Sequence, residues 1–160
     1  MTFAVRPFAE SDAPSVADVL FVAAVERAGR LQRVAAFDVP AAARRVVERL
    51  REVDPAGGFV VTAAGEVVGV GGTHARGRVA TIGPVALLPR HRGHGGGRQL
   101  LEACVAAVGG RGVQIRIVED GADATAIGLG LRGGFRIVTS VLELERSGAP
   151  RDAEAPASTP

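Results

Sequence analysis

Three consecutive glycines stand at the start of a predicted helix in the segment "PVALLPRHRGHGGGRQLLEACVAAV", residues 84–108. Glycine inside a helix costs about 1 kcal/mol per residue relative to alanine, so a chain that needed only a helix would not carry Gly95, Gly96 and Gly97 there. A helix N-terminus presents unpaired N–H groups and a partial positive charge, which bind anions, and glycines let a phosphate come close to the backbone. The segment therefore predicts a pyrophosphate-binding helix start, flanked by Arg92 and Arg98.

Two familiar phosphate-binding motifs do not fit this segment. A P-loop requires Lys followed by Ser or Thr after its last glycine, whereas this chain has Arg98-Gln99 and contains no lysine. The dinucleotide fingerprint G-x-G-x-x-G requires a third glycine three residues after Gly95, and Arg98 stands there. Neither motif therefore explains this segment.

The composition indicates one soluble domain without disulfides. A length of 160 residues suits a single hydrophobic core. The one cysteine, Cys104, cannot form an internal disulfide and suits a reducing compartment. The N-terminus does not resemble a signal peptide, and no apolar run reaches the length of about 18 residues that a membrane span needs. We expect a cytoplasmic protein that does not bind membranes.

The calculated pI of 9.8 does not indicate a nucleic-acid partner. The formal net charge is only +2, every basic residue apart from histidine is arginine, and tyrosine is absent. Few groups therefore titrate between neutrality and the arginine range, so a small excess charge raises the pI far. No aromatic residue interleaves the arginines of Arg90–Arg98, as a surface that stacks bases would require. We expect no nucleic-acid partner, and we interpret Arg44, Arg45, Arg49 and Arg51 as the solvated face of a helix.

The order of predicted elements indicates an α+β or mixed α/β fold. Apolar periodicity and turn residues predict the following segments: a strand at Phe3–Phe8, a helix from a cap at Ser11 or Asp12 to Gly29, a helix behind Pro40, three strands within residues 57–89 with turns at Ala64-Gly65 and near Arg76-Gly77, a helix over about Gly96–Val108, a strand around Val113–Val118, a short helix within residues 122–134, and one or two strands within Phe135–Arg146. We expect one domain over residues 1–146 and a disordered tail over residues 147–160, which lack core-forming side chains.

Two motifs and this order of elements resemble the GNAT superfamily of N-acetyltransferases. The hexapeptide Arg92–Gly97 matches R-x-x-G-x-G/A behind a strand that ends in proline, and Asp123–Phe135 aligns with N-x-x-A-x-x-L-Y-x-x-x-G-F at Ala126, Leu129, Gly134 and Phe135. The resemblance covers about Thr2 to Arg146. It implies a central, mostly antiparallel sheet with two splayed strands and helices on both faces.

The resemblance also implies that acetyl-CoA binds as co-substrate between the splayed strands, here about Ile82–Leu88 and Val113–Val118. Pro84 supports this independently, because proline lacks the N–H of a sheet ladder and marks a break in pairing. The pantetheine arm would bond to the backbone of Val85 and Leu87, and the Leu87 N–H would polarise the thioester carbonyl. The implied cofactor-binding residues are Val85, Ala86, Leu87, Arg92, Gly93, His94, Gly95, Gly96, Gly97, Arg98 and Asp123.

The sequence departs from the family at two positions of the second motif. Asp123 replaces the usual asparagine, and Gly130 stands where many members carry the tyrosine that protonates the leaving thiolate. General-acid help is worth about 10²–10⁴-fold, so its loss slows transfer without forbidding it. Two hypotheses follow: an N-acetyltransferase that acts on a primary amine, or a binding module that holds acyl-CoA as a sensor or interaction partner without turning it over.

The general base and the acceptor stay open at the sequence level. His74, near the end of a predicted strand, is a candidate base with a reference pKa near neutrality. A histidine at a strand end more often faces solvent, and a distant carboxylate that acts through water is an equal alternative. The resemblance places a small-molecule or peptide amine near "RAGRLQRVAAFDV", residues 27–39, and leaves open a homodimer through the closing strands. We expect no metal, because His91, His94 and Cys104 lack a fourth ligand. We interpret Cys104 as a small core residue rather than a nucleophile.

Overall fold

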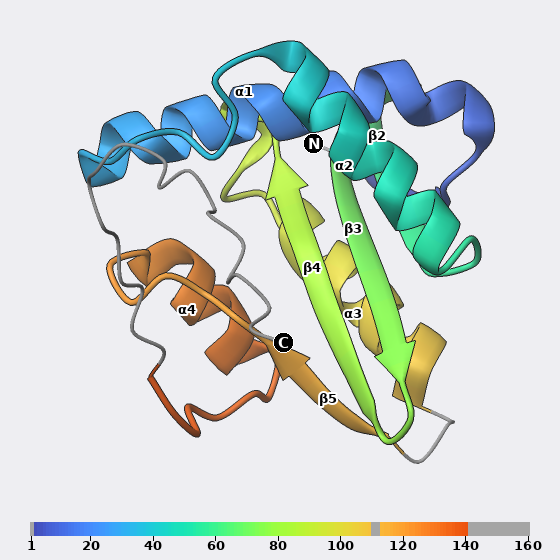
Figure 1. The fold of residues 1–160 in the computed structure, drawn as a ribbon, viewed down its shortest axis with the longest axis vertical. Coiled ribbons are helices and arrows are strands. Elements are labelled where there is room, and N and C mark those ends of the chain that lie inside the picture. The colour runs from blue at the N-terminus through green and yellow to red at the C-terminus, as the bar shows by residue number, and fades with distance from the viewer. Residues whose placement is uncertain (1, 110–112, 141–160) are drawn as a thin grey trace, which may run out of the picture.

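A computed structural model, described here for residues 2–109 and 113–140, places a five-stranded sheet between two pairs of helices (Figure 1). The expected order of elements is confirmed as far as the last helix. The elements are β1 Phe3–Pro7, α1 Ala13–Leu31, α2 Pro40–Val53, β2 Gly58–Ala63, β3 Glu66–Arg76, β4 Val79–Leu87, α3 Gly96–Gly109, β5 Gln114–Ile117 and α4 Ala124–Arg132, with short 3-10 turns at Glu10–Asp12 and Pro89–His91.

The strands follow one another in the sheet in chain order, β1-β2-β3-β4-β5. The first three pairs are antiparallel and β4 with β5 is parallel, so the expected mostly antiparallel sheet is confirmed. Hairpin turns join the middle strands. Ala64 and Gly65 take positive φ angles of 50° and 85°, the backbone of a tight two-residue hairpin. This is the turn that the Ala-Gly pair predicts.

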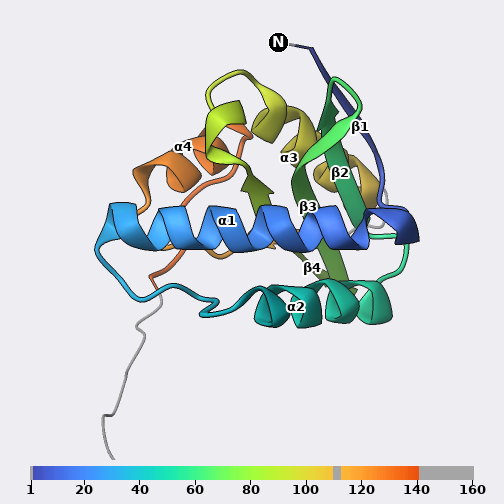
Figure 2. The same cartoon turned by 90° about the horizontal axis from the view of Figure 1, so that it is seen from above.

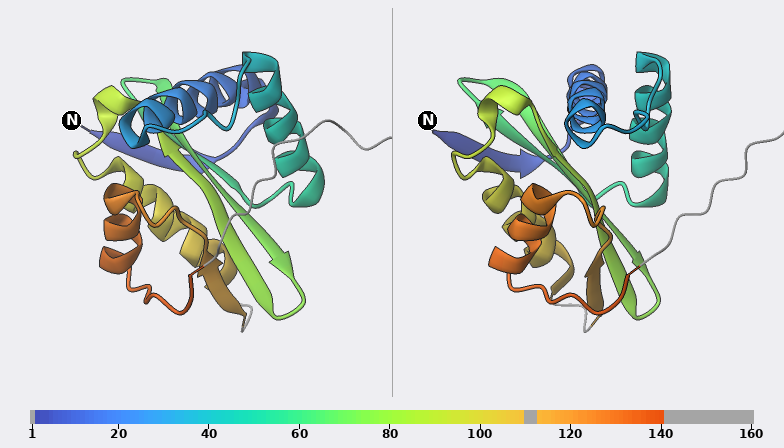
Figure 3. Two further views of the ribbon diagram at one scale, coloured as in Figure 1. Left: turned by 60° about the vertical axis from the view of Figure 1, so that its left-hand side comes forward. Right: turned by 90° about the vertical axis from the view of Figure 1, so that its left-hand side faces the viewer.

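Helices cover both faces of the sheet, as the resemblance implies (Figure 3). The helices α1 and α2 lie side by side on one face (Figure 2), and α3 lies on the other with α4 beside it. Alternate residues of the central strands point to the two faces, which gives each face its own apolar layer. The first layer contains Val16, Leu20, Val47, Val60 and Val70. The layers under α3 contain Val61, Val68, Ile82, Leu100, Leu101 and Cys104.

The ends of α1 differ from the prediction. The helix does not stop at Gly29 but continues to Leu31, and Gln32 ends it in the left-handed conformation with φ 53°. Asp12 occupies the cap position, but its side chain does not cap the helix. Its carboxylate instead accepts hydrogen bonds from Arg6 at 2.6 Å and from the Ala9 N–H at 2.8 Å. The physical reason is that Arg6 binds both carboxylate oxygens, at 2.6 and 2.8 Å, and so holds the group away from the helix amides.

The predicted closing strands are wrong for the part that the structure describes. Residues 135–140 form no strand, and Ile137 and Val138 are exposed. An alternating apolar pattern needs a hydrogen-bonding partner to become a strand, and no described strand pairs with this segment. Residues 141–146 and the predicted tail, 147–160, lie outside the described residues, so the domain boundary stays a prediction. None of the helices within residues 2–109 and 113–140 is long and apolar enough to cross a membrane.

Candidate functional site

The sheet opens between its two parallel strands. Pairing runs from Val79 with Gln114 to Ile82 with Ile117. The strand β5 ends there, whereas β4 continues to Leu87. On its other edge β4 pairs with β3 again from Val85 to Leu87, after an irregularity at Gly83 and Pro84. One edge of β4 is therefore left without a strand from residue 83 onward, among the described residues. The proline in this stretch lies where the prediction placed the break in pairing.

The direction of the peptide groups on this open edge follows from one hydrogen bond. The Leu88 N–H donates to Val68 O of β3 at 2.9 Å. Peptide groups along a strand alternate in direction, so the N–H groups of Leu87 and Val85 point away from β3, and that of Ala86 points toward it. The predicted backbone contacts at Val85 and Leu87 thus lie on the open edge.

The turn after β4 uses its glycines for backbone geometry. Gly93 and Gly95 have φ angles of 79° and 93°, a region that side-chain-bearing residues rarely adopt. A Cβ added at either position would meet nothing within 4 Å, so the space outside both stays open. The backbone here turns sharply and leaves room in front of it.

The first two glycines of α3 are not explained by backbone angles but by the space around them. A Cβ at Gly96 would lie 3.1 Å from Leu87 and 3.3 Å from the Phe3 ring, so this glycine is needed for packing. A Cβ at Gly97 would be in ordinary contact at 3.6 Å. The interpretation that all three consecutive glycines serve ligand approach is therefore incomplete: one sets the turn and one lets the helix pack closely.

The amides at the start of α3 lack acceptors in the described part of the chain. The first helical bond is donated by Gln99 N–H to Gly95 O at 3.1 Å. The N–H groups of Gly96, Gly97 and Arg98 precede it and have no helical partner, as at any helix N-terminus. They lie next to the open edge of β4, because Gly96 and Gly97 pack beside Leu87. Such a group of amides can bind an anion.

The side chains around this helix start already have partners. Arg92 pairs with Glu26 of α1, and its Nε donates to Leu87 O at 3.1 Å. Arg98 pairs with Glu102 one turn along α3 at 2.8 Å. His94 is exposed. Arg98 is engaged only through its Nε, so its terminal N–H groups remain available beside the main-chain amides.

Asp123 joins α4 to α1. Its carboxylate is buried, accepts from the Ala126 N–H at 3.2 Å, and pairs with Arg27 at 2.8 Å and Arg30 at 3.2 Å. Burial raises the pKa of this carboxyl, but the bonds from Arg30 and Ala126 and the charge of Arg27 outweigh it, so the pKa is lowered overall. The structure gives Asp123 a cap and a cross-link, and a role at the cofactor stays a prediction.

Glu119 is a candidate that the sequence reasoning missed. It lies two residues beyond Ile117, where β5 ends and the sheet opens, and its side chain is 27% exposed and 3.5 Å from Arg27. Burial raises the pKa of its carboxyl, Arg27 lowers it, and the nearby Asp123 and Asp120 raise it further, so the pKa is raised overall. A carboxyl with a raised pKa at an opening suits a general base. The sequence does contain a signal for it: Glu119 is an acidic residue that closely follows β5, the strand that pairs with the proline-containing strand β4.

His74 lies within the sheet and lines a hollow beside α2. It is opposite Thr81 in the register of β3 and β4. Its Nδ1 is buried and receives no hydrogen bond from the described residues. The hollow measures about 690 Å³. Its wall is formed by Ala36, Phe37, Ala42, Arg45, Val46, Arg49, Leu50, Val53, Thr73, His74 and Arg76.

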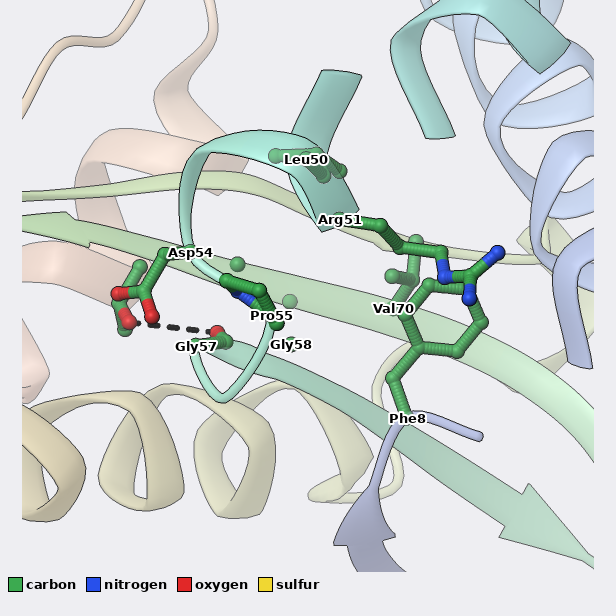
Figure 4. A pocket seen from close by; sticks show the side chains of 11 residues that line it. Phe8, Leu50, Arg51, Asp54, Pro55, Gly57, Gly58 and Val70 are labelled. Atoms are coloured by element: carbon green, nitrogen blue, oxygen red, sulfur yellow. Dashed lines mark hydrogen bonds between the residues drawn. The ribbon is translucent and has the colours of Figure 1, made fainter. Parts of the chain in front are cut away.

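A second cavity is too small for a ligand. It lies at the end of α2 between Phe8, Leu50, Asp54 and Gly57 (Figure 4) and has a volume of about 10 Å³. That is room for one water molecule at most. Within the described ranges, no three His, Cys, Asp or Glu side chains gather closely enough to hold a metal ion.

Two further predicted positions are clear in the structure. Cys104 is fully buried, and burial raises the pKa of its thiol to about 12. This confirms a core residue and not an activated nucleophile. Gly130 lies in α4, and a Cβ there would meet nothing within 4 Å. The backbone at the place of the family's tyrosine thus leaves room for the Cβ of a side chain.

Comparisons with known proteins concern the fold and the family of this chain. Among curated proteins no match to the sequence is found. Similar solved structures include PH1933 from Pyrococcus horikoshii OT3, with 17% identity over 88% of this chain and 92% of that one and a TM-score of 0.73. The PaiA N-acetyltransferase from Thermoplasma acidophilum, in complex with coenzyme A, has 13% identity over 88% and 94% and a TM-score of 0.73. The ribosomal-protein-S18-alanine N-acetyltransferase from Escherichia coli has 22% identity over 86% and 80% and a TM-score of 0.64.

At these low identities the likeness shows the fold alone. The sequence itself also matches the profile of the Acetyltransferase (GNAT) family over residues 26–135. That range contains the open edge of β4, the helix start of α3 and the second motif in α4. Because the match spans more than half of the chain, the protein belongs to the GNAT acetyltransferase family.

Proposed function

We propose that this chain transfers an acetyl group from acetyl-CoA to a primary amine. The observation that carries the proposal is the open edge of β4 beside the free amides of Gly96, Gly97 and Arg98. The edge offers N–H groups to an extended pantetheine arm at Val85 and Leu87, and the helix start offers donors to the diphosphate. The PaiA structure, which contains coenzyme A, supports the same cofactor.

The reaction would proceed by direct attack of the amine. The amine nitrogen forms a bond to the thioester carbonyl carbon, and the negative charge that develops on the oxygen is stabilised by the Leu87 N–H. The tetrahedral intermediate loses one proton from nitrogen to a base and expels the thiolate as the C–S bond breaks. Holding both reactants in place supplies much of the acceleration, on the order of 7–11 kcal/mol in favourable cases.

The reaction needs a base for the amine and can use an acid for the thiolate, and this chain offers few candidates for either. Gly130 offers no acid, so the thiolate leaves unassisted or takes a proton from water, which its reference pKa of about 8.5 permits. Glu119 and His74 are the two candidates for the base. Glu119 lies at the end of β5 beside the opening, and His74 is one rung below the last paired residue of β4.

Calorimetric titration with acetyl-CoA tests the binding site. Substitution of Gly95 is a poor test, because its φ of 93° strains any side chain. Gly97→Glu and Arg98→Glu place a negative charge at the helix start without that strain. We expect each to weaken binding at least tenfold, because both add a negative charge beside the phosphates and Arg98→Glu also removes a charge-assisted bond. Arg44→Glu, an exposed change on α2, is the control and should bind like the wild type. Equal affinity of all four proteins would contradict the proposal.

A second candidate function rests on Gly130. With no tyrosine in the chain, the domain could hold acyl-CoA as a sensor or interaction module without turnover. Release of free thiol from acetyl-CoA over a broad panel of amines separates the two functions. Turnover with any amine that is lost in Gly97→Glu supports the enzyme, and binding without any turnover supports the module.

We further propose a cytoplasmic location, since a single buried cysteine suits a reducing compartment.

A further inference from the structure

The sheet face opposite α3 carries a polar row just below the opening. Ile82 and Ile117 pack into the layer under α3. Side chains alternate between the faces of a strand, so Thr81 and Arg116, one residue earlier, point to the other face. His74 of β3 is paired with Thr81, and Thr81 with Arg116, so the three residues form one row across three strands. Of the three, His74 also lines the hollow beside α2, and so connects the row to it.

The hollow itself is cationic. Arg45 and Arg49 enter its wall from α2 and Arg76 from β3, and no Asp or Glu is among its lining residues. Arg49 has a partner, Glu52, at 3.3 Å. Arg45 and Arg76 have none among the described residues, and both are exposed. Phe37, Val46, Leu50 and Val53 supply an apolar part of the same wall. Unpaired arginines beside apolar surface suit an organic anion.

The two faces of the sheet differ in the room that they leave for an acceptor near the opening. The α3 side is filled by Leu101 and Cys104, which are buried against Ile82. The other face offers the hollow, and its far end lies near Arg76, which is paired with Val79. Val79 is four residues before Gly83, where the edge opens, and a strand rises about 3.3 Å per residue, so the two points are roughly 13 Å apart. The side chain of Arg76 can shorten that span.

We propose that the acceptor is an amine that also carries a carboxylate or phosphate, with Arg45 and Arg76 binding this anionic group and several bonds separating it from the amine. That the amine points toward the opening rests on the proposed function. That an anionic group binds in the hollow rests on the arginines of the hollow alone. The neutral remainder of the molecule lies against Phe37 and Val46.

Matched acids and amides test the anion preference. For the carboxylate, 6-aminohexanoate and 8-aminooctanoate are each compared with the corresponding terminal amide. For the phosphate, 6-aminohexyl phosphate is compared with 6-aminohexanol. We expect kcat/KM to be about tenfold or more higher for the anion, the effect of a charge-assisted bond. Arg45→Gln with Arg76→Gln should remove this preference and leave the affinity for acetyl-CoA unchanged. The control is Arg44→Gln, since Arg44 adjoins Arg45 in α2 and does not line the hollow.

A binding readout keeps this proposal separate from the catalytic one. Affinities of 6-acetamidohexanoate and its amide are measured by NMR titration in the presence of CoA, which needs no turnover. Stronger binding of the acid that is lost in the double variant supports the anion site even if no thiol is ever released. Equal binding of acid and amide, or a preference that survives in the double variant, overturns it even if the chain acetylates amines efficiently.

Discussion

Ile82 of β4 and Ile117 of β5 form the last rung of the parallel pair, and one residue later the two strands no longer pair. Both side chains are held in the layer under α3 with Leu101 and Cys104. The opening therefore begins directly above a packed apolar layer and not in a loose part of the sheet. This anchors the two sides of the candidate site, the edge of β4 and the segment after β5.

The glycines before and within α3 should respond oppositely to alanine. Gly95→Ala should lower the free energy of unfolding by about 1–2 kcal/mol, because a Cβ at φ 93° is strained. Gly97→Ala should raise it by up to about 1 kcal/mol, because alanine favours helix and its Cβ fits at 3.6 Å. Urea unfolding of both variants measures the difference. Equal effects of the two substitutions would contradict the backbone roles assigned here.

A tyrosine restored at position 130 should assist the leaving thiolate. A Cβ at this position would meet nothing within 4 Å, so the first atom of the new side chain has room. If proton donation limits the reaction, kcat should rise about tenfold or more, within the range of general-acid catalysis. Gly130→Phe is the matched control, since it adds the ring without the hydroxyl. An equal gain in both variants would assign the effect to packing of the ring and not to proton transfer.

Glu119 should contribute to the pH dependence of kcat. Its raised pKa places the loss of its proton above the usual glutamate value of about 4.3. If the carboxylate is the base, kcat should rise with pH through that raised value, and Glu119→Gln should remove this limb and lower kcat by about 10²-fold. His74→Gln is the parallel variant. Loss of the limb in His74→Gln alone would assign the base to the imidazole.

The two buried aspartates should make stability fall in acid. Pairing with Arg6 lowers the pKa of Asp12, and the balance of contacts lowers that of Asp123, so both carboxyls bind protons less readily when folded. Their stabilisation is complete above the unfolded value of about 3.9 and is lost as the pH falls through the lower folded values. Asp123→Asn keeps the cap but not the charge, and should cost about 1–2 kcal/mol at pH 7. Glu102→Gln, at an exposed pair, is the control and should change stability little.

Cys104 should be unreactive until the chain unfolds. With the pKa raised to about 12, only about a thousandth of the thiol is ionised at pH 9, whereas about half would be in an unfolded chain. Iodoacetamide labelling at pH 9 should therefore be slow in native protein and fast in urea. Rapid native labelling would show that the layer beneath α3 opens readily.

The sequence predicts best what depends on local pattern. Apolar periodicity locates the helices, Ala64-Gly65 locates a hairpin, and Pro84 locates the break in pairing. It predicts worst what depends on long-range partners. Glu26 meets Arg92 across 66 positions, and Arg27 meets Glu119 and Asp123 across more than 90, so no local pattern could reveal that these side chains are engaged.

The same limit explains the closing segment and Gly29. Residues 135–140 alternate like a strand, but alternation does not supply a neighbouring edge. Gly29 looks like a helix stop, but a Cβ there would meet nothing within 4 Å, and the helix passes through it to Leu31. In the closing segment the tertiary surroundings decide against the local preference, whereas at Gly29 the helix simply tolerates one glycine at a cost of about 1 kcal/mol.

The open edge of β4 has a thermodynamic consequence. A cofactor that supplies the missing hydrogen bonds to this edge binds the folded chain and not the unfolded one, so it stabilises the fold by mass action, by about 2.7 kcal/mol at a concentration one hundred times the Kd. The lifetime of the protein against proteolysis would then follow the acetyl-CoA concentration around it, and its abundance would report on the metabolic supply of its own substrate.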